Sequence, residues 1–161
     1  MSGLVAGPVS SCGIDDAVLL KSVHGVRLSQ PATLDCRTAR TLGGWVTQSA
    51  TPEVGRMGGG LSGLRVAAHY ICRTRNHQRG ARISEHGKGR AIDIPALRLR
   101  DESEISVLDD WGQGPNGHVL RRVHRQACGP FGRVLGAGSD GFRRDHLHFD
   151  TSRHHGGAYC R

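Results

Sequence analysis

The sequence lacks any apolar run long enough to cross a bilayer, and this excludes a membrane-spanning helix within its 161 residues. Residues 1–11 also lack the charged start and the long apolar segment of a secretory signal peptide. Aromatic residues make up only 4% of the chain and do not alternate with the basic ones, so the stacking surface of single-strand nucleic-acid binders is missing. No internal repeat occurs. The length is that of one domain with a core of its own.

The five cysteines include no C-x-x-C pair, which argues against a zinc knuckle and a thioredoxin-type redox motif. They are Cys12, Cys36, Cys72, Cys128 and Cys160. Their wide spacing is typical of disulfides that hold together a loop-rich exported domain, and free core thiols in a cytosolic protein are the alternative. Because an odd count leaves one thiol over after export, we expect a sixth cysteine upstream, in a segment that also carries the signal peptide.

The charge balance indicates an anionic partner. Twenty-two Lys+Arg stand against 14 Asp+Glu, a formal net charge of +8. A nucleic acid, an acidic surface or an acidic polymer would each fit this excess. The basic residues are scattered along the chain, so a specific nucleic-acid site is not supported and a basic surface is the simpler interpretation.

Residues 84–94 offer an imidazole and a carboxylate, His86 and Asp93, seven positions apart. Gly89 and Ala91 between them mark a place where large side chains are unwelcome. A strand that ends in a tight glycine turn would direct both groups at one point. Far downstream, residues 145–150 alternate like a strand, so His146 and His148 share a face.

One of these two histidines would complete a set of three N/O ligands with a fourth position left for water. That set is typical of a catalytic zinc site and differs from the closed four-ligand set of a structural one. The alternative is that these residues are surface groups or hydrogen-bonded turn partners, because a chain with ten histidines supplies an H-x-H by chance.

The remaining pattern predicts an α+β fold with a small, mainly antiparallel sheet, flanking helices and long loops. We expect a helix from Pro31 to Trp45, a loop at 47–63 and a short helix at 118–127. The expected strands are short ones within residues 11–30, a central one at 64–73, and others at 92–94, 104–108, 131–135 and 146–150.

Two motifs together resemble the zinc peptidases grouped as lysostaphin, D-Ala-D-Ala peptidase and hedgehog. They are S-x-H-x-x-G-x-A-x-D at residues 84–93 and D-H-x-H at residues 145–148. More closely, the chain resembles the bacterial extensin-like family (extensin-like C-terminal domain). Beside residues 84–94, this likeness is carried by Cys12-Gly13-Ile14, Pro31-Ala32-Thr33-Leu34-Asp35-Cys36, residues 68–76, Ala127-Cys128-Gly129-Pro130-Phe131, Val134-Leu135-Gly136 and Tyr159-Cys160. It covers a domain at residues 11–161, after an N-terminal tail at residues 1–10.

The resemblance implies a hedgehog/D-Ala-D-Ala-peptidase-like fold and a location in the periplasm or envelope. It further implies zinc bound by His86, Asp93 and His148, with His146 as the base or as a stabiliser of the oxyanion. Relatives in the wider zinc group cut peptide bonds of peptidoglycan. D-Ala-D-Ala peptidases place a Glu shortly before the last ligand, where this chain has Asp145 and His146. This difference leaves the identity of the base open and places the chain nearer the murein endopeptidases.

Other polar residues have supporting roles in this interpretation. Alternation places Asp150 on the face of His146 and His148, so it is a better partner for a ligand histidine than Asp145, which would point away unless the strand bends. Ser84 hydrogen-bonds the turn or binds the metal through water, and a turn serine is the simpler role.

Two arginines are candidates for substrate binding. Arg73 and Arg75, at the end of the expected central strand, would hold a substrate carboxylate, with ordinary surface arginines as the alternative.

Three functions compete. The first is a zinc-dependent peptidoglycan hydrolase of the envelope. The second is a non-catalytic envelope module that binds a metal and cell-wall polymer. The third, a nucleic-acid-binding metalloprotein, depends on charge alone. The sequence leaves the bond cut, the disulfide pairing and the oligomeric state open.

Overall fold

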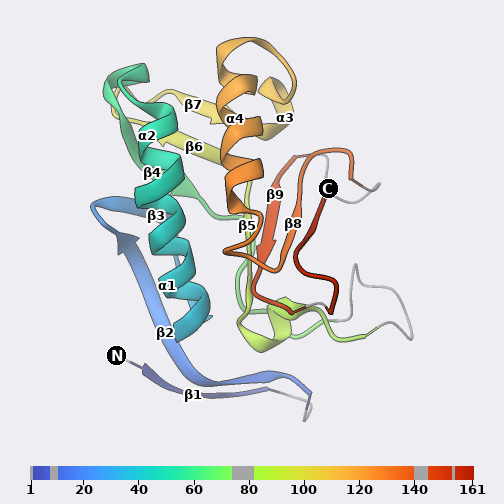
Figure 1. Cartoon of the computed structure of the whole chain (residues 1–161). Coiled ribbons are helices and arrows are strands. Elements are labelled where there is room, and N and C mark those ends of the chain that lie inside the picture. The colour runs from blue at the N-terminus through green and yellow to red at the C-terminus, as the bar shows by residue number, and fades with distance from the viewer. Residues whose placement is uncertain (1, 8–10, 74–81, 140–144, 154) are drawn as a thin grey trace.

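The computed structural model describes residues 2–7, 11–73, 82–139, 145–153 and 155–161. It has an α+β fold with two mixed sheets, as Figure 1 shows. The predicted fold class is therefore confirmed, but the single small sheet is wrong. Two sheets form because the chain after residue 65 leaves the first sheet and pairs with a strand of the second, through a bridge between Ala68 and Asp93.

The larger sheet has six strands in the order β1-β2-β3-β4-β6-β7. Its strands are β1 (Ser2–Ala6), β2 (Gly13–Val23), β3 (Val26–Asp35), β4 (Leu61–Arg65), β6 (Ala96–Leu99) and β7 (Glu104–Ser106). Only β3 and β4 pair in parallel, because the helical segment between them returns the chain to the same end of the sheet.

The smaller sheet carries the candidate site. Its four strands run in the order β10-β8-β9-β5, with β5 (Ala91–Ile94), β8 (Arg133–Leu135), β9 (Leu147–Asp150) and β10 (Tyr159–Cys160). The pairs β5/β9 and β8/β9 are antiparallel, and β10/β8 is parallel. Every residue of β5 and β9 is buried, so these two strands lie in the interior with both faces covered.

The helices cover the strands on one side of the molecule (Figure 1). They are α1 (Cys36–Trp45), a π-helical turn η1 (Val46–Ala50), α2 (Thr51–Val54), a 3-10 turn η2 (Met57–Gly59), α3 (Val107–Asp110) and α4 (Gly114–Ala127). The predicted helix at 118–127 lies within α4, whose Val119, Val123 and Ala127 are all buried.

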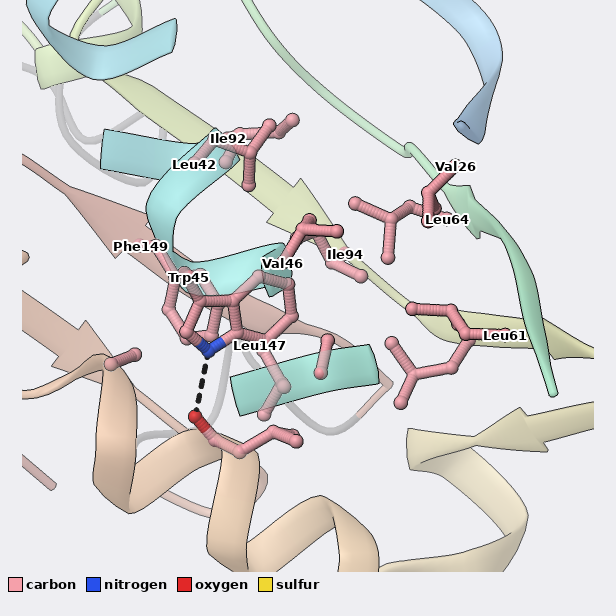
Figure 2. Packing of buried hydrophobic residues seen from close by; sticks show 14 of the residues in the cluster. Val26, Leu42, Trp45, Val46, Leu61, Leu64, Ile92, Ile94, Leu147 and Phe149 are labelled. Carbon is pink, nitrogen blue, oxygen red and sulfur yellow. Dashed lines mark hydrogen bonds between the residues drawn. The ribbon is translucent and has the colours of Figure 1, made fainter. Parts of the chain in front are cut away.

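The core joins the two sheets and the helices. Figure 2 shows Ile92 and Ile94 of β5 and Leu147 and Phe149 of β9 packed against the first helices. The Trp45 ring meets Phe149 edge-on at 5.0 Å, and its Nε1 donates a hydrogen bond of 2.9 Å to the Val123 carbonyl. Burying these side chains stabilises the strands by roughly 2 kcal/mol each. It also fixes the position of the polar residues on their other face.

The helix predicted to start at Pro31 is wrong at its beginning. Pro31 lies within β3, at the register shift of the β2/β3 ladder, where its missing N–H costs no ladder bond. The helix starts at Cys36 because the Asp35 carboxylate accepts a 2.7 Å hydrogen bond from the Thr38 amide.

The loop predicted at residues 47–63 is also wrong. Helical structure continues past the Gly43-Gly44 pair to Val54, because Val46, Ala50 and Val54 recur every four residues and are all buried against the core. Strand β4 follows at Leu61–Arg65, earlier than the strand expected at 64–73. The strand β6 directly after Pro95 was not predicted.

Two disulfides link Cys12 to Cys72 and Cys128 to Cys160, and Cys36 is a free thiol. Disulfides form and persist in oxidising compartments, so they indicate a domain that resides outside the cytoplasm. Among the described residues, no helix combines the length and the apolar character needed to cross a membrane.

Candidate metal centre

The register of the smaller sheet brings Asp93 and His148 together. The two residues are directly paired across the antiparallel β5/β9 ladder, so their side chains leave the sheet on the same face. Their neighbours Ile92, Ile94, Leu147 and Phe149 belong to the hydrophobic core. The alternation of polar and apolar residues in both strands therefore positions two candidate ligands at once.

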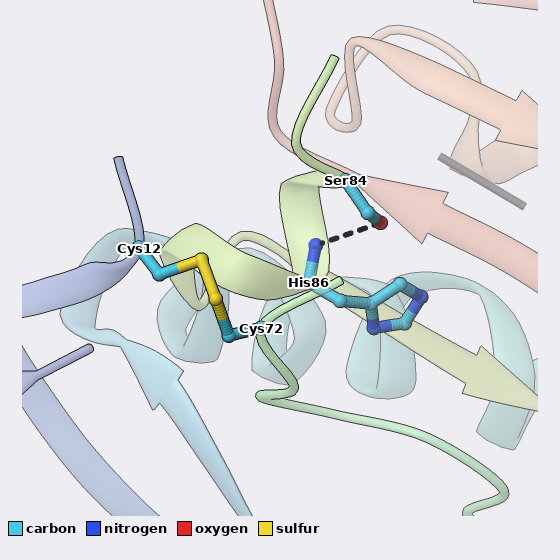
Figure 3. The surroundings of a disulfide bond; sticks show 4 residues. All are labelled: Cys12, Cys72, Ser84 and His86. Atoms are coloured by element: carbon cyan, nitrogen blue, oxygen red, sulfur yellow. Dashed lines mark hydrogen bonds between the residues drawn. A yellow bond between two sulfur atoms is a disulfide. The ribbon is translucent and has the colours of Figure 1, made fainter. Parts of the chain in front are cut away.

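His86 reaches the same point from a separate turn, η4 (Glu85–Lys88). The Ser84 hydroxyl caps the turn by accepting a hydrogen bond from the His86 amide, as Figure 3 shows. Gly89 ends it with φ +68°, a backbone conformation that favours glycine, and a Cβ there would lie 2.3 Å from Ile14 Cδ1. The expected glycine turn exists, as a 3-10 turn that leads into β5.

The three side chains converge on a space that could hold a metal ion. One ligand atom from each of His86, Asp93 and His148 lies within 4.8 Å of the other two. Asp93 Oδ1 is 3.2 Å from His86 Nε2 and 2.9 Å from His148 Nδ1. All three residues are at most 5% exposed. Two imidazoles and a carboxylate are a donor set that suits zinc, so the residues fit the predicted cofactor.

The outer nitrogens of both imidazoles are occupied. His86 Nδ1 donates to the His69 carbonyl at 2.7 Å, and His148 Nε2 donates to Asp150 Oδ2 at 2.7 Å. Metal-binding histidines generally hold their second ring nitrogen in this way, which fixes the tautomer and leaves the first nitrogen free to bind. His86 Nε2 and His148 Nδ1 thereby face Asp93, and each donates a hydrogen bond to its carboxylate when protonated and would offer a lone pair to a metal when deprotonated.

The electrostatics of the group match this arrangement. Burial acts to raise the pKa of the Asp93 carboxyl, but hydrogen bonds from His148 and His86 outweigh it and hold the pKa well below its usual value. Burial likewise acts to lower the pKa of His148, and Asp150 and Asp93 together raise it above its usual value. The site therefore favours positive charge between its carboxylates, which is the charge that a divalent cation would supply.

Three further groups lie around the outer oxygen of Asp93. His146 Nε2 is 3.6 Å and Arg73 Nη2 is 3.8 Å from Asp93 Oδ2. Asp145 Oδ1 accepts a 2.8 Å hydrogen bond from His146 Nδ1. The His146 side chain is 18% exposed and that of Asp145 is 63% exposed, so these groups form the solvent-accessible side of the site.

The structure places nearly all of the predicted site residues at one point. His86, Asp93 and His148 meet, His146 and Arg73 adjoin them, Asp150 contacts His148, and Asp145 contacts His146. Asp145 turns toward the site because residues 145 and 146 precede β9, which begins at Leu147. Arg75 lies outside the described residues. Ser84 contacts the turn instead of the cluster.

His69 was not among the predicted site residues, and its place in the site was missed. Its carbonyl holds the His86 ring, and its own Nδ1 accepts a 3.2 Å hydrogen bond from the Thr33 amide. Every residue has a backbone carbonyl, so the residue type at position 69 gives no indication of this role. The nearest hint was the position of His69 upstream of the motif.

A substitution at Asp150 tests whether its hydrogen bond to His148 supports zinc binding. Asp150→Asn keeps the shape but weakens the hydrogen bond to His148 Nε2, so zinc affinity should fall by about 10-fold to 100-fold. Competition with a chromophoric chelator measures this. Ser152→Ala is the matched control, because it removes a hydroxyl donor from Asp150 Oδ1 and leaves the contact with His148 in place. Equal losses of zinc affinity in Asp150→Asn and Ser152→Ala would contradict the role of the Asp150 carboxylate in holding His148.

Comparison with known proteins identifies a family. The family described as Extensin-like protein C-terminus matches residues 5–161. No curated protein and no solved structure matches the chain.

Proposed function

We propose, from the premise that this chain belongs to the Extensin-like protein C-terminus family, that it is a zinc-dependent hydrolase of peptidoglycan. The bonds concerned are those of stem or crosslink peptides in the bacterial envelope. The observation that carries the proposal is the buried His86-Asp93-His148 group, with a histidine and an arginine on its open side. The two disulfides agree with an exported protein.

In this proposal His86 Nε2, His148 Nδ1 and Asp93 hold zinc. The ion supplies a Lewis acid that polarises the scissile carbonyl and lowers the pKa of water to about 7. His69 and Asp150 keep the two imidazoles in the tautomers that binding requires. These three ligands would leave the ion accessible to the reactants.

His146 is the proposed base. Its Nδ1 is bonded to Asp145, so the ring proton stays on that nitrogen and Nε2 presents a lone pair toward Asp93. His146 would accept a proton from the attacking water and return it to the leaving amine. Asp145 supports the imidazolium that forms between these two transfers.

Arg73 is the proposed substrate-binding group, with Arg75 as a second candidate. The Arg73 guanidinium lies beside Asp93 at the edge of the site, where it can hold a carboxylate of the peptide through paired hydrogen bonds. The net charge of +8 would draw the protein to an anionic wall. We expect no specific nucleic-acid partner.

A digestion assay tests the hydrolase. Purified protein is incubated with muropeptides, and products are followed by mass spectrometry and by the appearance of new primary amines. We expect cleavage that stops with chelator, resumes on adding zinc, and is unchanged in His118→Ala, an exposed histidine of α4. Intact muropeptides after prolonged incubation with zinc-loaded protein would refute the proposal.

The second candidate is a non-catalytic envelope module that binds metal and wall polymer. It is favoured by the depth of the group, since Asp93 is only 4% exposed. Retention on purified sacculi without any released product would support this module.

A further inference from the structure

We infer that the Cys12–Cys72 disulfide is a positioning device for the candidate ligand His86, so that metal affinity depends on this bond being closed. The inference rests on the proposed metal site. It adds to that site the Cys12–Cys72 bond, whose cysteines lie outside the two ligand motifs at residues 84–93 and 145–148. Figure 3 shows the disulfide directly beside the turn that carries Ser84 and His86.

The segment at residues 69–73 holds the His86 turn from behind, and we call it the strap. It makes three hydrogen bonds to the turn, all through its own backbone. The His69 carbonyl accepts from His86 Nδ1 at 2.7 Å, and the Ile71 amide donates to the His86 carbonyl at 3.2 Å. The Arg73 carbonyl accepts from the Ser84 amide at 2.9 Å. The orientation of the His86 ring is thus set by where the strap lies.

The strap is fixed at both ends by different means. At its start, Ala67 and Ala68 exchange backbone hydrogen bonds of 2.9 and 3.0 Å with Asp93 of β5. Near its end, Cys72 is bonded to Cys12, the residue just before β2. Residues 69–73 belong to no helix or strand, and they are half-buried except for Ile71, which is 42% exposed, so no strand ladder holds this part of the strap. The disulfide therefore supplies the restraint at the second end.

The disulfide also leaves little space beside the turn. A Cβ placed on Gly87, the residue after His86, would lie 3.1 Å from Cys12 Sγ. Arg73, next to Cys72, carries the guanidinium that lies 3.8 Å from Asp93 Oδ2. Opening the bond would release a ligand and a substrate-binding group together. We expect the folded protein to survive this, with its sheets intact but with His86 less well directed.

The second disulfide is a matched control. Cys128 and Cys160 join the end of α4 to β10, and β8 separates β10 from the ligand strand β9. The two bonds have sequence separations of 60 and 32 residues, and loop entropy depends only on the logarithm of that number. Their removal should therefore destabilise the fold by comparable amounts, while only one of them contacts the site.

The test compares Cys12→Ala/Cys72→Ala with Cys128→Ala/Cys160→Ala. Zinc affinity is measured by chelator competition at a temperature where both variants are folded by circular dichroism. We expect affinity to fall by about 10-fold to 100-fold in the first variant, as when an outer partner of a ligand is removed, and by less than about twofold in the second. Equal affinities in the two variants would overturn the inference.

A second measurement covers the case in which the first variant does not fold. Zinc-loaded wild type is reduced with a phosphine while an indicator dye reports free zinc and alkylation mapping reports open cysteines. Zinc release in step with alkylation of Cys72 supports the inference, and zinc retained after complete alkylation of Cys72 overturns it. A wild type that binds no zinc refutes the metal site itself, so the two failures are distinguishable.

Discussion

His86→Ala is expected to bind zinc about 10²-fold to 10³-fold more weakly than the wild type. Zinc sites with four protein ligands bind with about 10–16 kcal/mol, so one ligand accounts for about 2.5–4 kcal/mol of that total. With His86 gone, Asp93 and His148 remain as a two-ligand set, and the carbonyl of His69 loses its donor. His148 cannot supply a second nitrogen in place of the lost one, because its Nε2 is held by Asp150.

The measurement is metal content after dialysis, followed by chelator competition. We expect about one zinc per chain in the wild type and a trace in His86→Ala. His118→Ala is the control, because it also removes one histidine, but an exposed one on α4. Zinc retained at full stoichiometry by His86→Ala would show that the ion, if any, binds elsewhere.

The residue types predicted the site better than they predicted the fold. Asp93 and His148 each sit in a short alternating strand, and alternation fixes which side chains share a face. His86 follows a serine cap and precedes a glycine turn, and both signals are local. These features need no knowledge of distant contacts. Ligand chemistry predicted that His86, Asp93 and one histidine of the H-x-H would converge, and the family resemblance indicated that this histidine is His148.

The errors came from places where distant contacts decide local structure. Pro31 is acceptable at a helix start and equally acceptable in β3, and the register shift opposite it selects the strand. The Gly43-Gly44 pair should weaken a helix, yet burial of Val46, Ala50 and Val54 carries it onward. Disulfide pairing and the role of the His69 carbonyl depend on the folded arrangement alone.

The two histidines of the H-x-H differ in their surroundings, and this difference defines their proposed roles. His148 is 5% exposed and contacts carboxylates through both nitrogens. His146 contacts Asp145 through Nδ1, while its Nε2 stays 3.6 Å from the outer oxygen of Asp93. A ligand must be held deep in the cluster, whereas a base must reach a reactant. The geometry agrees with His148 as the ligand and His146 as the base.

His146→Ala should therefore separate catalysis from metal binding. We expect the rate of muropeptide cleavage to fall by about 10²-fold to 10⁴-fold, the usual contribution of a positioned acid–base group. Zinc affinity should stay within a few-fold of the wild type, because the three ligand residues keep their contacts. The rate is followed by product formation under single-turnover conditions, with zinc content measured on the same samples.

Asp145→Asn is the graded comparison for this prediction. It keeps a hydrogen-bond acceptor for His146 Nδ1 but removes the charge that supports the imidazolium, so its cleavage rate should lie between those of the wild type and His146→Ala. If His146→Ala instead loses zinc as completely as His86→Ala, the two histidines have exchanged roles and His146 is a ligand. If His146→Ala cleaves at the wild-type rate, proton transfer depends on another group. Comparing the cleavage rates of the wild type, Asp145→Asn and His146→Ala at equal zinc content therefore tests whether His146 is the base and His148 the ligand.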